Sequence, residues 1–185
     1  VVIEHFEGCT PRFLNPEILL PESTFVLADI KMRENTFLEW STTNETGILD
    51  YDIEQFKWNH WVSVGQVRGK GGVTKNKYSF KVPLHSGINK FRVTQTDNSG
   101  EKRVSTEVTQ ESSIKEFSMT PTSVRDDIFF YSGGKKKKTR YEVFDAFGNL
   151  LKVGFADHVD CRNIVNGIYY MNYDNKNEKF LKASE

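Results

Sequence analysis

The feature that most constrains the fold of this chain is a series of short segments in which apolar and polar residues alternate. From Phe25 to Val108 these segments are separated by turn signals, among them Arg33–Asn35 and Asp97–Gly100. Side chains of a β-strand point alternately to opposite faces of the sheet, so this alternation predicts strands that are buried on one face. No segment shows a convincing helical pattern, and aromatic residues make up 13% of the chain, which also favours strands.

The first part of the chain therefore predicts one strand after another. We expect strands at 26–32, 37–40, 51–56, 61–67, 78–82, 91–95 and 104–108. Short strands with turns between them are typical of an all-β sandwich of the immunoglobulin or fibronectin type III kind.

The C-terminal part carries two clearer signals. Val143 alternates with its neighbours, the turn 146–149 contains Gly148, and apolar residues resume at Leu150, which together predict a β-hairpin. Farther on, the turn Asn166–Gly167 leads into an aromatic strand. Shorter strands are expected at 117–121, 128–131 and 179–182.

A chain of 185 residues is long enough for two small domains. The short polar segment 110–113 is interpreted as a linker between them. We therefore expect an extended N-terminal arm at 1–20, a fibronectin type III-like sandwich at 21–110 and a smaller sandwich at 111–185, which makes the fold two tandem β-sandwiches.

The arm is predicted to be extended because Pro11, Pro16 and Pro21 exclude a regular helix. We expect Ile18–Leu20 to pack on the domain that follows. The chain begins with Val rather than Met, and the sequence leaves open whether its N-terminus was processed or it is a piece of a longer protein.

Charge and hydropathy exclude several classes of function. Lys+Arg and Asp+Glu both number 25, a formal net charge of +0, whereas a non-specific nucleic-acid binder normally has a basic excess. No apolar run approaches the roughly 18 residues that span a bilayer. The histidines lack the spacing of metal ligands, so no metal or other cofactor is expected; they are His5, His60, His85 and His158.

No catalytic constellation is recognisable, and we expect no enzyme. Gly69–Gly72 lacks the helix that a phosphate-binding loop requires. Asp126 and Asp127 are adjacent, so on a strand they would point to opposite faces and could not act as an acid/base pair.

Cys9 and Cys161 are too few for a disulfide framework. They are either two unrelated thiols or a long-range disulfide that fastens the N-terminal arm to the second domain, which an exported protein would permit. The sequence leaves both interpretations open.

The first sandwich resembles the fibronectin-like module that often precedes a type IX secretion sorting domain. The resemblance covers about residues 20–110 and rests on four segments: Leu38–Ser41, Tyr51–Glu54, Asn89–Val93 and Asp97–Gly100. Phe91 stands where Tyr is common in that module.

Residues 114–185 resemble the type A C-terminal sorting domain of cargo exported by the type IX secretion system. Val143–Asn149 matches the family's hairpin, Asn166–Tyr169 its Gly-x-Tyr element and Lys179–Lys182 its terminal strand. The opening segment departs from the family pattern, because only Pro121 remains of its Pro-Asn-Pro.

This resemblance implies an exported, non-enzymatic protein at the outer membrane or cell surface. Its C-terminal domain would be recognised by the type IX translocon or its outer-membrane β-barrel shuttle. The residues implied in partner binding are Pro121, Gly148, Gly167, Tyr169, Lys179, Phe180, Leu181 and Lys182. The chain is either a bound accessory of the secretion or gliding machinery or the C-terminal part of a larger surface enzyme or adhesin.

Two further features have both a structural and a functional interpretation. Lys135, Lys136, Lys137 and Lys138 form a solvated hairpin tip that protects a sheet edge, or they contact lipopolysaccharide or an acidic barrel loop. Trp58 and Trp61 flank a predicted turn. They either cap the core or form the platform of a carbohydrate-binding module.

Overall fold

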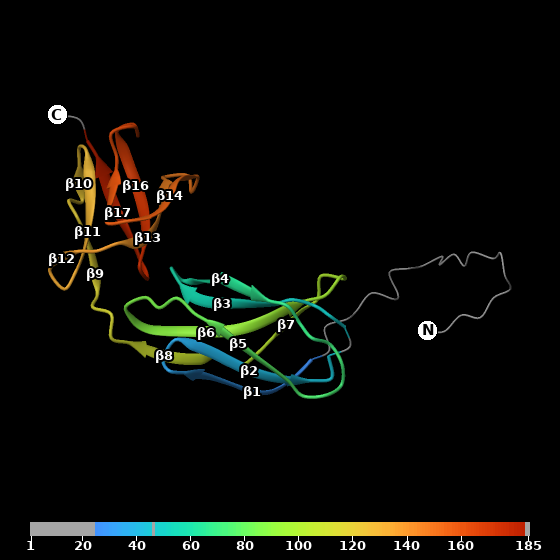
Figure 1. Ribbon diagram of the computed structural model, residues 1–185. Helices are drawn as coiled ribbons and strands as arrows, with labels where there is room; N and C mark the ends of the chain where they lie inside the picture. Colours follow the sequence, from blue (N-terminus) through green and yellow to red (C-terminus); the bar gives the residue numbers. More distant parts are fainter. Residues whose placement is uncertain (1–24, 46, 184–185) are drawn as a thin grey trace, which may run out of the picture.

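The computed structural model describes residues 25–45 and 47–183, and its regular elements are all β-strands. Two β-sandwiches follow one another along the chain, each with a separate hydrophobic core (Figure 1). The predicted all-β fold with two tandem sandwiches is confirmed. The arm at 1–20, the packing of Ile18–Leu20, His5 and Cys9 lie outside the described residues.

The N-terminal sandwich consists of two antiparallel sheets. The first has the order β1-β2-β5, and the second has the order β4-β3-β6-β7, with β8 also paired to β6. This is the strand arrangement of a fibronectin type III-like module, in which the fourth strand belongs to the larger sheet. The strands are β1 (Val26–Arg33), β2 (Phe37–Thr43), β3 (Tyr51–Lys57), β4 (His60–Val67), β5 (Asn76–Lys81), β6 (Gly87–Thr96), β7 (Lys102–Val104) and β8 (Val108–Ser112).

Aromatic side chains from both sheets fill the core of this sandwich. Trp40 stacks on Tyr78 with ring centroids 5.2 Å apart, and Phe25 meets the edge of Tyr51 at 5.2 Å. Tyr51 and Phe91 have no exposed surface. The alternation seen in the sequence therefore directs one row of each strand into this aromatic core.

Two predicted boundaries in this domain are wrong. The expected strand 104–108 is divided into β7 and β8, because Ser105 binds back to β6: its N–H donates to the carbonyl of Val93 at 2.9 Å, and its Oγ accepts from the Val93 N–H at 2.9 Å. The expected linker 110–113 belongs mainly to β8, which pairs with β6 up to Ser112. The connection between the domains is therefore 113–116.

The C-terminal sandwich has a five-stranded sheet with the order β10-β17-β16-β13-β14. Facing it is a four-stranded sheet with the order β12-β11-β15, in which β9 also pairs with β11. The strands are β9 (Phe117–Thr120), β10 (Ser123–Val124), β11 (Asp127–Ser132), β12 (Lys135–Lys136), β13 (Thr139–Asp145), β14 (Leu150–Ala156), β15 (His158–Asp160), β16 (Gly167–Tyr173) and β17 (Lys176–Lys182).

The two hairpin signals of the sequence form the centre of this domain. The β13–β14 turn has Gly148 at φ 85°, and Asp145 Oδ1 closes it by accepting from the N–H groups of Phe147 and Asn149. The aromatic strand predicted after Asn166 is β16, which supplies stacked pairs to the core. Tyr169 stacks on Phe180 with ring centroids 5.5 Å apart, and Tyr173 stacks on Phe130 with ring centroids 5.3 Å apart.

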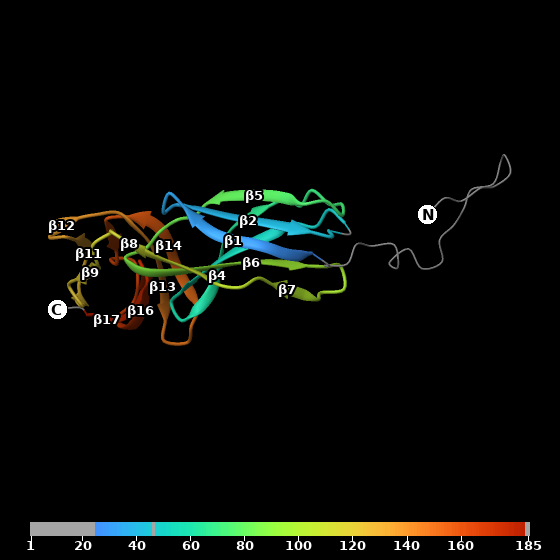
Figure 2. The same cartoon turned by 90° about the horizontal axis from the view of Figure 1, so that it is seen from below.

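The C-terminal sandwich stands at one end of the N-terminal sandwich, so that the two form an L (Figures 1 and 2). The turn between β16 and β17 reaches the loop before β6. There the Ser86 N–H donates to Asp174 Oδ1 at 3.0 Å, the Ser86 hydroxyl donates to Asp174 Oδ2, and Asn175 Nδ2 donates to the Ser86 carbonyl at 3.2 Å. Ser86 and Asp174 are 3% and 8% exposed. We call this set of contacts the domain clasp.

Two buried amides hold the loop that carries Ser86. Asn89 accepts from the His85 N–H at 3.0 Å and donates to the His85 carbonyl at 3.0 Å. Gln55 donates to Asn89 Oδ1 at 2.8 Å and to the Pro83 carbonyl at 2.9 Å. Ser86 is thus already positioned by its own domain before Asp174 meets it, which lowers the entropy lost in forming the clasp.

Candidate functional site

The terminal strand β17 divides its side chains between the core and the surface. Phe180 is 1% exposed in the core, and Lys182 is 8% exposed, with its ammonium donating to the carbonyl of Arg125. Lys179 and Leu181 point to the outer face, where Leu181 is 45% exposed. Of the four residues implied in partner binding on this strand, Phe180 and Lys182 therefore fix the strand, and only Lys179 and Leu181 are open to contact.

The neighbouring strand extends this outer face. Leu181 pairs with Ile168, and Lys179 pairs with Tyr170. Ile168 is 47% exposed and Tyr170 is 39% exposed, whereas Tyr169, which the resemblance implied in partner binding, is buried against Phe180. We call Ile168, Tyr170, Lys179 and Leu181 the terminal face.

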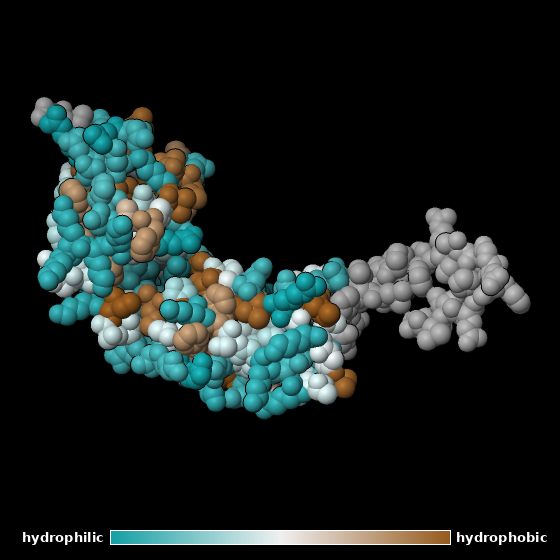
Figure 3. Space-filling model, in the orientation of Figure 1, coloured by the Kyte–Doolittle hydropathy of each residue, from teal (hydrophilic) through white to brown (hydrophobic). Residues whose placement is uncertain are grey.

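Apolar side chains continue from the terminal face across the sheet. Tyr170 lies opposite Phe144 on β13, which in turn lies opposite Leu150 on β14. Val153 and Phe155 follow on the same side of β14, and Phe155 is 71% exposed. Figure 3 shows hydrophobic side chains gathered over β14 on the inner side of the L. A continuous exposed apolar surface of this kind is typical of an interaction site.

The edge of β17 is partly covered. β10 pairs with it in parallel at Ser123 and Val124, and the Leu181 N–H donates to the Thr122 carbonyl at 2.8 Å. Pro121, exposed between β9 and β10, begins this cover. A partner that binds the last residues of β17 would therefore contact the outer face of the sheet and not its edge.

The two glycines implied in partner binding have different positions. Gly148 lies at the exposed tip of the β13–β14 hairpin beside Phe147, which is 93% exposed. Gly167 begins β16 and pairs with Lys182. The structure therefore places Gly148 away from the terminal face and Gly167 next to it.

The lysine run differs slightly from the predicted hairpin tip. The turn itself is Gly133–Gly134, with φ of 60° and 76°, and Lys135 and Lys136 form the return strand β12. All four lysines are exposed. The ammonium of Lys136 lies 3.7 Å from the centre of the Phe129 ring, a cation–π contact that covers an aromatic side chain.

The tryptophans do not form a sugar-binding platform, which is one of the two interpretations that the sequence leaves open. Trp58 is only 8% exposed, and the Lys57 ammonium lies 4.1 Å from the centre of its ring. Trp61 is covered by the Arg92 guanidinium at 4.1 Å and by the edge of Phe56. A carbohydrate ring requires an open aromatic face, so the alternative interpretation, in which these rings cap other side chains, describes them better.

The described histidines lie in separate places. His60, His85 and His158 each contact a neighbouring carbonyl or carboxylate, of Trp58, Ser86 and Asp157 respectively. Within 25–45 and 47–183 no group of three or more His, Cys, Asp or Glu side chains could hold a metal ion. The same residues include no helix that is long and apolar enough to cross a membrane.

Cys161 is a free thiol in the core of the C-terminal sandwich. Its Sγ donates to the Val159 carbonyl at 3.6 Å, and burial raises the pKa of this thiol to about 11. A thiol that stays protonated and has no exposed surface is unreactive. Its pairing with Cys9 stays a prediction, because Cys9 lies outside the described residues.

The sequence did not reveal the domain clasp or the apolar face of β14. Ser86 and Asp174 are ordinary turn residues in the sequence, and they are separated by 88 positions. In the sequence, the apolar residues that resume at Leu150 indicate only the second strand of a hairpin. The signal that could have been used is the succession Leu150, Leu151, Val153 and Phe155, which is too apolar for a strand with one solvated face.

No protein-family model matches this sequence, and no curated protein matches it either. Solved structures with a similar arrangement include the FN1–FN3 domains of chicken CNTN1, with a TM-score of 0.31, 11% identity, and coverage of 89% of this chain and 67% of that chain. The fibronectin(III)-like modules of Clostridium thermocellum CbhA give a TM-score of 0.29 and 12% identity, and cover 86% of this chain and 94% of that chain.

A tetra-tandem repeat in the extending region of a large adhesion protein gives a TM-score of 0.33 and 12% identity, with coverage of 84% of this chain and 49% of that chain. TM-scores and identities this low carry no statement about what the present chain binds. The fibronectin type III-like assignment of the first sandwich therefore depends on its own strand order.

Proposed function

We propose that this chain is a non-enzymatic exported protein whose C-terminal sandwich is a docking domain for the type IX secretion translocon or its outer-membrane β-barrel shuttle. The observation that carries the proposal is the terminal face, where the last strand of a domain that resembles a type IX sorting domain exposes Leu181 and Lys179 beside Ile168 and Tyr170. The role is the same whether the chain acts by itself or as the tail of a larger surface protein.

The geometry supports recognition by contact with a sheet face. Phe180 and Lys182 hold β17 in place from the inner side, so Leu181 and Lys179 are presented on a rigid strand. A partner surface with apolar side chains and a carboxylate opposite Lys179 would complement this face. Most of the affinity would come from the apolar contacts, because an exposed ion pair contributes only about 0–1 kcal/mol.

The N-terminal sandwich would act as a spacer that the domain clasp holds in one orientation. Ser86 and Asp174 are almost fully buried, and each hydrogen bond of the clasp that is lost would leave a buried polar group unpaired. A partner that binds the terminal face would therefore bind a protein in which the domain clasp fixes the orientation of one sandwich relative to the other.

The proposal is tested by affinity capture from outer membranes of a bacterium with type IX secretion. The tagged full chain should recover an outer-membrane barrel of this system, and a chain that lacks residues 113–185, with β8 left complete, should not. Leu181→Asp should also abolish capture, because it places a charge in the apolar part of the terminal face.

Val104→Asp is the matched control for this variant. Val104 is 46% exposed on β7 of the N-terminal sandwich, close to the 45% of Leu181, so a charge there perturbs the surface equally but leaves the terminal face intact. Capture of the barrel by the Leu181→Asp chain, in a fold unchanged by circular dichroism, would contradict the proposal.

A further inference from the structure

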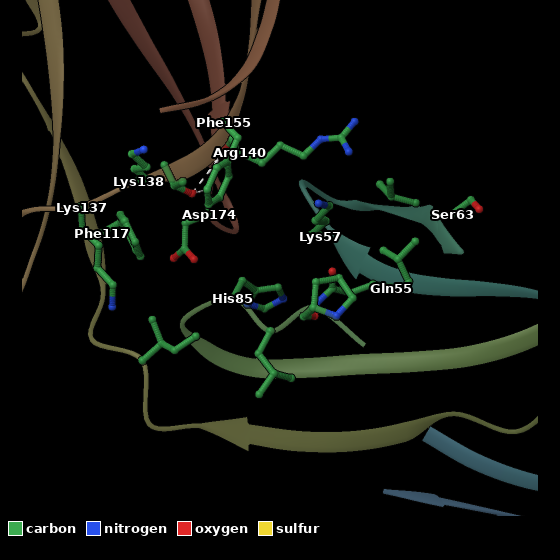
Figure 4. Close-up of a pocket in the computed structure, with 16 residues that line it drawn as sticks. Gln55, Lys57, Ser63, His85, Phe117, Lys137, Lys138, Arg140, Phe155 and Asp174 are labelled. Carbon is green, nitrogen blue, oxygen red and sulfur yellow. Dashed lines mark hydrogen bonds between the residues drawn. The ribbon is translucent and has the colours of Figure 1, made fainter. Parts of the chain in front are cut away.

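A groove of about 490 Å³ lies in the inner corner of the L, between the two sandwiches. Figure 4 shows side chains from both domains around it, with Lys57 and Gln55 on the N-terminal side and Arg140, Phe155 and Asp174 on the C-terminal side. The groove is adjacent to β14, at the opposite edge of the sheet from β10 and β17. It is therefore a different surface from the terminal face.

An edge strand of each sandwich contributes to the lining of this groove, three consecutive residues from β4 and Phe155 from β14. β4 pairs only with β3, and β14 pairs only with β13, among the strands that the structure describes. Val62, Ser63 and Val64 of β4 line the groove. An unpaired edge presents a row of free N–H and C=O groups, which is a template for the backbone of another extended chain.

The wall of the groove is apolar next to these edges. Leu84, Ile114, Phe117 and Phe155 contribute to its lining. Phe117 belongs to the core of the C-terminal sandwich, Ile114 packs against that core, and Leu84 packs against the core of the N-terminal one. This part of the wall is therefore fixed by packing, and side chains placed against it would be removed from water without a large loss of order in the protein.

The rim of the groove is cationic, because Lys57, Lys137, Lys138 and Arg140 all line it. In Figure 4 the Arg140 side chain extends from β13 towards the region above Lys57 of β3. The carboxylate that also lines the groove, Asp174, already accepts both hydrogen bonds of the clasp from Ser86.

These cations have few anionic partners of their own. Arg140 has one carboxylate neighbour, Glu142, at 3.6 Å. In the described part of the chain, Lys57, Lys137 and Lys138 form no ion pair. Burial lowers the pKa of Lys57 and the nearby positive charge of Arg140 lowers it further, while Glu142 and Asp174 offset only part of this shift. A further negative group placed between the two cations would stabilise their charged forms.

We propose that this interdomain groove binds an extended peptide segment of a partner protein that carries acidic and apolar side chains, and that the segment adds as a strand to the edge of β4. A strand of alternating character would direct apolar side chains to the wall and carboxylates to the rim. The unpaired backbone edge and the apolar wall favour a peptide over a phosphate-bearing glycan, which could use only the cationic rim.

The test uses the full chain and a short fluorescent peptide of alternating glutamate and valine, with binding followed by fluorescence anisotropy. We expect saturable binding that weakens as salt is added, because the pairs with the rim are partly exposed. A peptide in which lysine replaces glutamate should not bind. A third peptide, N-methylated at alternate backbone positions, should bind at least about tenfold more weakly, since it cannot pair with the β4 edge.

The lysine run supplies a matched pair of variants. Lys137 and Lys138 line the groove, whereas Lys135 and Lys136 do not. The double variant Lys137→Gln/Lys138→Gln should weaken binding of the glutamate peptide roughly fivefold, and Lys135→Gln/Lys136→Gln should leave it unchanged. The double variant Lys57→Gln/Arg140→Gln should reduce binding further, because these residues come from both walls.

Three results would overturn the proposal. The first is equal loss of binding in the two lysine double variants, which would indicate non-specific attraction to the run. The second is full affinity of the N-methylated peptide, which would exclude strand addition. The third is displacement of the glutamate peptide by inorganic phosphate when the two are present at the same concentration of negative charge. That result would indicate a simple anion site. The two lysine double variants change exposed residues away from the tryptophans, so a normal tryptophan fluorescence spectrum is expected in both. Lys57→Gln/Arg140→Gln removes the cation above the Trp58 ring, so the fold of that variant is checked by far-ultraviolet circular dichroism.

Discussion

On the outer face of β3 and β6 the N-terminal sandwich carries a cluster of ion pairs beside a few exposed apolar side chains, whereas exposed apolar side chains predominate on the outer face of β14 in the C-terminal sandwich. Glu54 accepts from Arg92 Nε at 2.6 Å and from Lys102 Nζ at 2.6 Å. Arg92 also covers the Trp61 ring. On β13 the Arg140–Glu142 pair lies opposite Phe155 and Val153, which nevertheless remain 71% and 57% exposed.

The two domains share a fold class but differ in the chemistry of these outer sheet faces. An outer sheet face that is covered by charges resists association with other surfaces. An outer face with exposed apolar residues costs free energy in water unless another surface covers it. By its outer sheet face, the C-terminal sandwich is therefore the better suited of the two to contact another surface.

The two domains also differ in where their carboxylates with lowered pKa values lie, buried in the first and at the surface in the second. In the N-terminal sandwich Glu45 is 3% exposed and accepts from the Tyr78 hydroxyl at 2.8 Å and the Gly71 N–H at 2.8 Å, as well as from the Thr42 hydroxyl. Burial alone would raise the pKa of Glu45, but these hydrogen bonds outweigh it and the pKa lies below its ordinary value. The carboxylates of the C-terminal sandwich with lowered pKa values are at the surface.

The largest effect is expected from truncating one core at a time. Phe91→Ala in the N-terminal core and Phe130→Ala in the C-terminal core remove side chains with no exposed surface, so each should lower the stability of its own domain by about 3–5 kcal/mol. All three tryptophans, Trp40, Trp58 and Trp61, lie in the N-terminal sandwich. Tryptophan fluorescence during urea unfolding should therefore detect Phe91→Ala strongly and Phe130→Ala weakly.

Equal shifts of the tryptophan transition in the two core variants would contradict this independence. Such a result would mean that the domains unfold as one cooperative unit. Near-ultraviolet circular dichroism of the tyrosines provides a second probe that covers both cores, with Tyr51 and Tyr78 in the N-terminal one and Tyr141, Tyr169 and Tyr173 in or against the C-terminal one; two separate transitions are expected in this signal.

Removing the domain clasp should have a smaller effect. Asp174→Ala leaves the buried N–H and hydroxyl of Ser86 without acceptors, which should cost about 1–3 kcal/mol of coupling between the domains. Small-angle X-ray scattering should then show a wider distribution of domain orientations. Asp174→Asn keeps one acceptor oxygen and should lie between the wild type and Asp174→Ala; scattering identical to the wild type in both variants would show that the clasp does not fix the L.

Acid should destabilise the N-terminal sandwich before the C-terminal one. The pKa of Glu45 in the folded state is below the ordinary value of 4.5. Its contribution to stability is therefore complete above that pH and is lost as the pH falls through the folded-state pKa. Glu45→Gln should lower the free energy of unfolding at neutral pH by about 1–2 kcal/mol and flatten the pH dependence below 4.5.

The measurement is urea unfolding by tryptophan fluorescence between neutral pH and the acid limit of the fold. The control is Asp145→Asn, which changes an exposed turn carboxylate of the other domain. An unchanged acid limb in Glu45→Gln would show that other carboxylates, Glu54 first among them, determine the acid sensitivity of this domain.

The smallest effect on stability is expected on the outer face of β14. Phe155→Ser should change the free energy of unfolding by less than about 0.5 kcal/mol, because the ring is mainly in water. The same variant should reduce self-association of the chain at high concentration, which analytical ultracentrifugation measures. A loss of stability comparable to that of the core variants would mean that this face is covered in the free protein. The outer faces of the two domains would then not differ in exposed apolar surface.

Several parts of the fold follow from the sequence because they depend on short-range rules. Alternation predicted the sandwich strands, and the glycine of the 146–149 turn predicted the β13–β14 hairpin. The sequence was less informative where a strand is interrupted by a contact from elsewhere, as at Ser105, whose bonds to β6 end β7. It left two interpretations open at Trp58, and the burial of the ring decides for the one in which the side chain is covered.

The composition and periodicity of this chain thus determined that it forms β-strands, where most strands begin, and which residues lie in one row. The tertiary structure alone decided which row faces inward: on β17 it buries a lysine and exposes a leucine. It also decided that Ser86 meets Asp174 and that residues of one edge strand from each sandwich line one cationic groove. The physical reason is that periodicity is a local property of the backbone, whereas pairing between sheets and domains is decided by packing between residues far apart in the chain.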